Sequence, residues 1–103
     1  MADQLSIYGE AVVWSFDLLG LSTPDKDEDE QSIELALAAY LNELVANDFN
    51  KLIGILYRID ISQEKAVAAL AEGAETETAG EILASLIINR QKEKIYYRKL
   101  YSK

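Results

Sequence analysis

The chain has 103 residues, of which 50% are hydrophobic and 27% charged, a composition suited to a single folded domain. It contains neither cysteine nor histidine, which excludes disulfides, thiolate nucleophiles, imidazole acid–base catalysis and zinc sites built on these ligands. Its formal net charge is −8. No apolar stretch reaches the roughly 20 residues that a membrane span requires, and the first residues lack the cationic start of a secretory signal. The cytoplasm is therefore the expected compartment.

Helix-forming residues dominate the chain, and the first predicted helix covers residues 3–19. Its apolar residues recur at steps of three or four, which places them on one helical face: Leu5, Tyr8, Val12, Phe16 and Leu19. The β-branched and aromatic residues at positions 11–16 leave a strand open as an alternative there. Gly20 suits the position after a helix, and Pro24 prevents the helix from continuing.

Residues 22–32 form an acidic linker, whose last carboxylates complement the positive end of the next helix dipole. Three of its acids match the first three ligand positions of a helix-loop-helix calcium loop: Asp25, Asp27 and Asp29. The match ends there, because the sixth position holds Glu30 instead of glycine and the twelfth holds Ala36 instead of a carboxylate. A solvated loop is the better interpretation, and we assign no metal or cofactor site.

The middle of the chain predicts three shorter helical segments. Apolar residues recur in helical register over residues 33–45, and a cleaner amphipathic pattern follows over residues 49–57. In one interpretation, Asn47 or Asp48 ends the first segment and separates it from the second. In the alternative interpretation, the two segments form one bent helix. The apolar positions of the second segment are Phe49, Leu52, Ile53, Leu56 and Tyr57.

Ser62 is a credible N-cap for a helix over residues 63–72. The inner face of that helix is predicted to be Ala66, Val67 and Leu70. Ser62 and Lys65 are also the best candidates for serine–lysine catalysis, but capping already explains the serine.

The last predicted helix begins at Thr78, where Thr78 and Glu81 match a capping box, and continues to Tyr101. Its apolar positions face the core as far as Ile88. All residues from Asn89 to Lys94 are polar, so we expect the helix to leave the core near Asn89. Five amphipathic helices joined by short loops predict an all-α fold, a compact bundle with a long C-terminal helix in one domain over residues 1–103.

Charge is unevenly distributed along the chain. Residues 1–87 hold seventeen acids and four bases, whereas residues 88–103 hold one acid and six bases. In a local interpretation, the cations complement the helix dipole and lie against the acids of residues 25–30. In a docking interpretation, tyrosines and cations of the basic, tyrosine-rich end, residues 89–103, bind a partner, since Tyr and Arg are enriched in binding hot spots. The candidate partner-binding residues are Arg90, Lys94, Arg98, Tyr96, Tyr97 and Tyr101.

The sequence therefore predicts a non-enzymatic protein that acts through protein–protein contact, as an adaptor, a regulator or a subunit of an assembly. The acidic body and basic end are self-complementary, so a homodimer is one form of this hypothesis. The alternatives are an acidic nucleic-acid mimic that occupies a nucleic-acid-binding protein, and an enzyme that uses carboxylates such as Glu10 and Asp17. The negative body disfavours direct nucleic-acid binding.

The stretch from Leu41 to Arg98 contains NDFNKLIGILYRIDIS and EILASLIINRQKEK and enters the basic aromatic run. It resembles a group of small helical bacterial proteins that has no assigned activity. The resemblance covers a little over half of the chain and depends on the pattern of apolar and charged positions. It implies a bacterial cytoplasmic protein and transfers no site residues.

Overall fold

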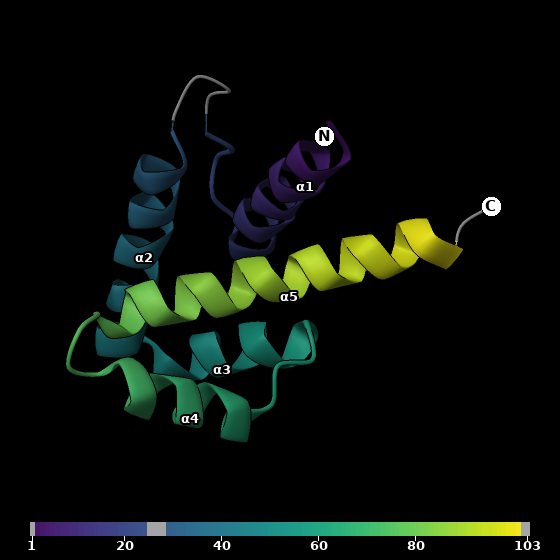
Figure 1. The fold of residues 1–103 in the computed structure, drawn as a ribbon. Coiled ribbons are helices and arrows are strands. Elements are labelled where there is room, and N and C mark those ends of the chain that lie inside the picture. Colours follow the sequence, from purple (N-terminus) through teal and green to yellow (C-terminus); the bar gives the residue numbers. More distant parts are fainter. Residues whose placement is uncertain (1, 25–28, 102–103) are drawn as a thin grey trace.

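A computed structural model describes residues 2–24 and 29–101, and the side chains of residues 7–24 and 29–101. These residues form an all-α bundle with a long C-terminal helix, as the sequence predicted (Figure 1). The helices are α1 (Ala2–Leu19), α2 (Glu30–Asn47), α3 (Phe49–Arg58), α4 (Gln63–Gly73) and α5 (Ala79–Tyr101). None of these described helices is both long and apolar enough to cross a membrane.

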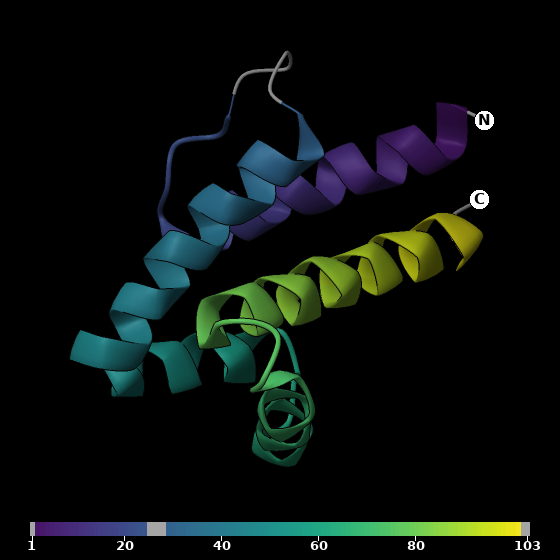
Figure 2. The same ribbon diagram turned by 60° about the vertical axis from the view of Figure 1, so that its left-hand side comes forward.

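Helix α5 is the element around which the others are arranged, since α1, α2 and α4 all pack against it. It lies across α1 and α2, with α3 and α4 along its opposite side (Figure 1). Figure 2 shows α1 and α5 running antiparallel, so that the start of α1 and the end of α5 lie at the same end of the molecule. The most deeply buried large apolar side chains are Leu37, Leu41, Leu52, Leu83, Ile87 and Ile95.

Local capping interactions determine where the helices begin and end. Asp48 separates α2 from α3: its N–H donates to the Leu44 carbonyl (2.8 Å), and its carboxylate accepts from the Lys51 N–H (3.2 Å). These bonds make two helices instead of one bent helix. At the end of α1, Gly20 adopts a positive φ of 74°, a conformation that favours glycine.

The two predicted caps of the later helices are both present. The Ser62 hydroxyl accepts from the Lys65 N–H (3.0 Å) at the start of α4. At the start of α5, the Thr78 hydroxyl accepts from the Glu81 N–H (3.2 Å), and the Glu81 carboxylate accepts from the Thr78 N–H (2.8 Å). This reciprocal pair is the capping box that the sequence predicted.

Helices α2 and α5 are in close contact at Gly80. The Gly80 N–H donates to Asn42 Oδ1 (2.7 Å), and the Asn42 amide nitrogen donates to the Thr78 hydroxyl (3.2 Å). A Cβ atom at position 80 would collide with the Ala38 carbonyl oxygen and lie 2.7 Å from Asn42 Cγ. The fold therefore requires glycine at position 80, because the contact with α2 leaves no room for a side chain.

Some predicted inner faces are wrong. Val67 is exposed, although its spacing placed it with the buried Ala66. Phe49 and Tyr57 are exposed as well, whereas Leu52 and Leu56 of the same helix are buried. Helices α3 and α4 lie at the edge of the bundle, so only a narrow stripe of each is covered. Of the apolar face predicted for α1, Val12, Phe16 and Leu19 are buried and Tyr8 is half-buried, while the Leu5 side chain lies outside the described part.

Candidate functional site

The C-terminal helix stays in the core for longer than the sequence predicted. We expected α5 to leave the core near Asn89, but Gln91 is buried and Ile95 is only 1% exposed. Both continue the spacing of Ala84 and Ile88 along the face that packs against the bundle. The polar run from Asn89 to Lys94 therefore contains one residue that faces inward, and α5 emerges only after Ile95.

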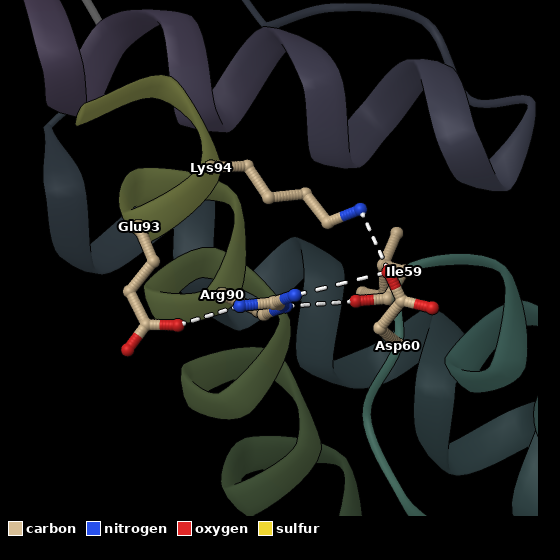
Figure 3. A network of polar contacts seen from close by, with 5 residues as sticks. All are labelled: Ile59, Asp60, Arg90, Glu93 and Lys94. Atoms are coloured by element: carbon tan, nitrogen blue, oxygen red, sulfur yellow. Dashed lines mark hydrogen bonds and ion pairs between the residues drawn. The ribbon is translucent and has the colours of Figure 1, made fainter. Parts of the chain in front are cut away.

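Two of the candidate cations hold α5 against the turn between α3 and α4 (Figure 3). Arg90 Nε donates to the Ile59 carbonyl (2.9 Å), and its two terminal nitrogens approach the carboxylates of Glu93 (2.9 Å) and Asp60 (3.8 Å). Lys94 Nζ lies 3.4 Å from the same Asp60 carboxylate. Arg90 and Lys94 thus make contacts within their own chain.

The carboxylate that pairs with Arg90 and Lys94 differs from the acids that the local interpretation named. The local interpretation placed the cations of α5 against the linker acids of residues 25–30, of which residues 25–28 lie outside the described part. Arg90 and Lys94 instead pair with Asp60, which has a left-handed backbone (φ 63°) at the end of α3. That conformation turns the chain beneath α5 and brings the Asp60 carboxylate to the two cations.

The next two cations lie against α1. The Arg98 guanidinium is 5.7 Å from the centre of the Trp14 ring, within cation–π distance. Lys99 Nζ is 3.7 Å from Glu10 Oε2, a pair in which both side chains are half exposed. A groove of about 590 Å³ lies between α1 and α5 and is lined by Val13, Trp14 and Arg98.

Beyond Ile95, four large side chains of α5 face solvent together. They are Tyr96, Tyr97, Leu100 and Tyr101, which are 51%, 52%, 48% and 79% exposed, and we call them the tyrosine surface. The Tyr97 and Tyr101 rings stack with centres 6.4 Å apart, and Tyr96 meets Tyr97 edge-on at 5.4 Å. Leu100 was not among the candidate residues, although its four-residue spacing from Tyr96 indicates a shared face.

A second groove, of about 920 Å³, runs beside this surface between α5 and the starts of α1 and α2. Lys92 and Tyr96 line its α5 side, and Tyr8 and Glu34 line the opposite side. The Tyr8 hydroxyl donates to Glu34 Oε2 (3.1 Å). Burial, together with the Glu34 charge, raises the pKa of Tyr8, so the phenol keeps its proton and remains a donor at neutral pH.

The acids considered for catalysis or metal binding have ordinary surroundings where the structure describes them. Glu10 and Asp17 face solvent. Asp29 caps α2 by accepting from the Ser32 N–H (2.7 Å), a bond that lowers the pKa of Asp29. Asp25 and Asp27 lie outside the described residues. No cluster of three or more metal-ligating side chains occurs among residues 2–24 and 29–101.

Comparison of the chain with models of protein families, with curated proteins and with solved structures finds no match in any of the three.

Proposed function

We propose that this chain is a cytoplasmic protein that acts by binding protein through the tyrosine surface, as an adaptor, a regulator or a subunit of an assembly. One observation supports the proposal above the others. Of nine large hydrophobic side chains exposed in the described part of the chain, four lie together on the last turns of α5. Contiguous exposed apolar groups mark interaction sites, and tyrosine is enriched among the residues that dominate binding energy.

The tyrosine surface directly follows a part of α5 that is packed against the bundle. Ile95 anchors α5 in the core one residue before the surface begins, and Arg90 and Lys94 fix the preceding turn to Asp60. Stacking of Tyr97 on Tyr101 further restricts two of the side chains. A surface that is ordered before binding loses less conformational entropy when the complex forms, which favours affinity.

The distribution of cations favours a protein partner over nucleic acid. Arg90 and Lys94 are paired with Asp60, and Arg98 lies on Trp14. Affinity for nucleic acid depends on the number of phosphates that cations neutralise. The cations already engaged within the chain would have to leave these partners, in a protein whose residues 1–87 carry a large excess of acids.

The proposal is tested by removing the tyrosines without removing the support. The triple variant Tyr96→Ser/Tyr97→Ser/Tyr101→Ser and the control Tyr57→Ser are each used as bait in an extract of the source cells. Tyr57 is 82% exposed but lies on α3. We expect the wild type and the control to retain a protein that the triple variant loses, with all three giving the same helical circular dichroism. Equal recovery by all three baits contradicts the proposal.

A further inference from the structure

We infer that the occupant of the tyrosine surface is a second copy of this chain, paired through antiparallel α5 helices around a two-fold axis between Lys92 and Glu93. The inference rests on the proposed function of this surface and names its partner. It follows from the order of side-chain sizes and charges along the outer side of α5, which lies across the front of the other helices in Figure 1.

The side chains along this outer stripe are small at one end and large at the other. Its positions are separated by three or four residues and therefore share a face: Ser85, Asn89, Lys92, Tyr96 and Leu100. Ser85 and Asn89 are small, whereas Tyr96 and Leu100 are large and about half exposed. A parallel partner would place large residues on large and small on small. An antiparallel partner places each large residue on a small one.

One register satisfies the whole stripe. When Lys92 lies opposite Glu93 of the second copy, Tyr96 lies opposite Asn89 and Leu100 lies opposite Ser85. Every contact then occurs twice, because a two-fold interface presents the same patch on both chains. The Glu93 side chain is about half exposed although it pairs with Arg90 within its own chain, so its carboxylate is accessible to a partner's Lys92.

Charge along α5 agrees with the antiparallel direction. Its first half borders a shallow groove that is lined by Glu34, Glu77 and Glu81 and includes the exposed Leu35. Its second half carries Lys92, whereas Lys99 is held by Glu10 of α1. Antiparallel pairing brings Lys92 of each helix opposite Glu93 of the other, and it places Leu100 beside the acidic groove and its exposed Leu35. Parallel pairing would place cations on cations and acids on acids, an arrangement that disfavours association.

The groove of about 920 Å³ beside the stripe can receive side chains of the second helix. Its far wall is formed by Tyr8 and Glu34, and Ile88 contributes an apolar group from α5. Each chain contributes this groove and its tyrosine surface to the same two-fold interface, so the pairing closes after two copies.

A charge exchange across the axis tests the inference. Sedimentation equilibrium of the wild type at about 100 µM, where micromolar dimers are largely formed, should give twice the chain mass of 11.5 kDa. Lys92→Glu and Glu93→Lys each place like charges opposite one another twice, so each should raise the dimer Kd about tenfold. The double variant should return to the wild-type Kd, and so should an equimolar mixture of the two single variants. Lys65→Glu, on the exposed side of α4, is the control and should change nothing.

Cross-linking tests the register, and the chain offers a clean background because it has no cysteine. Ser85→Cys and Leu100→Cys chains of distinguishable mass are mixed and oxidised. We expect disulfides that join position 85 of one chain to position 100 of the other. Each of these chains carries one cysteine, so every disulfide that forms joins two chains. Links between identical positions would overturn the antiparallel arrangement.

The outcomes separate the inference from the proposed function. A chain that sediments at 11.5 kDa overturns the inference, as does a dimer whose Kd is unchanged by the charge exchange. The tyrosine variants in the capture experiment decide the proposed function independently, because a foreign protein lost by the triple variant supports protein binding even when the chain is monomeric.

Discussion

Replacing Gly80 by alanine tests the close contact between α2 and α5. Gly80 is the second residue of α5, it is buried, and its N–H donates to Asn42 Oδ1 at 2.7 Å. A Cβ there would meet the Ala38 carbonyl oxygen, a backbone atom of α2 that cannot rotate away. Relief of the collision requires the two helices to separate, and separation stretches the bond to Asn42.

The expected magnitude is a balance of opposing terms. Alanine is favoured over glycine in a helix by up to about 1 kcal/mol. Overpacking costs about 1–3 kcal/mol, and loss of the hydrogen bond to Asn42 costs about 1 kcal/mol. We therefore expect Gly80→Ala to lower the free energy of unfolding by about 2 kcal/mol. In a domain of this size that corresponds to a fall in Tm of roughly 8 °C or more.

The assay is urea and thermal unfolding followed by far-ultraviolet circular dichroism, with Gly54→Ala as the matched control. Gly54 is an exposed residue in the middle of α3, and a Cβ there meets nothing within 4 Å. The control should gain about 0.5–1 kcal/mol through helix propensity alone. The two substitutions should therefore change stability in opposite directions. A Gly80→Ala protein as stable as the wild type would refute the packing argument.

Three further predictions concern α5 and its neighbours. Deleting residues 89–103 removes the buried Ile95 and should abolish the helical circular dichroism signal, whereas deleting residues 97–103 should preserve most of that signal. Equal signals from the two deletions would contradict this boundary of the core. Arg90→Met should lower the free energy of unfolding by about 1–2 kcal/mol, because the bond to the Ile59 carbonyl is lost. Asp60→Asn should lower it by less than about 1 kcal/mol, because the Asp60 carboxylate is 70% exposed. Chemical denaturation should show this order and not the reverse. The folded state raises the pKa of Tyr8 above its ordinary value of 10.0, so the unfolded chain releases this proton first and stability should fall as pH rises above 10. Tyr8→Phe should make that fall less steep, and unchanged slopes between pH 9 and 11 would be evidence against the shift.

Part of the candidate surface could be predicted from the sequence. The tyrosines of the last turns were singled out from composition and charge, and Tyr96, Tyr97 and Tyr101 are indeed exposed together. Their role in binding stays a prediction. Arg90 and Lys94 were grouped with them because all lie on one helix, but their carboxylate partner is Asp60, about thirty residues earlier in the chain. No local pattern indicates a pairing at that separation.

Local signals in the sequence are enough to predict the all-α class and most of the helix ends. Apolar spacing and caps such as Ser62 act over three or four residues, so they can be read from neighbouring positions. The side of each helix that is covered, and the number of turns over which it is covered, depend on tertiary packing. A helical repeat identifies residues that share a face, but coverage depends on where distant segments pack. For that reason Gln91 is buried within a polar run, while Val67 is exposed within an apolar one.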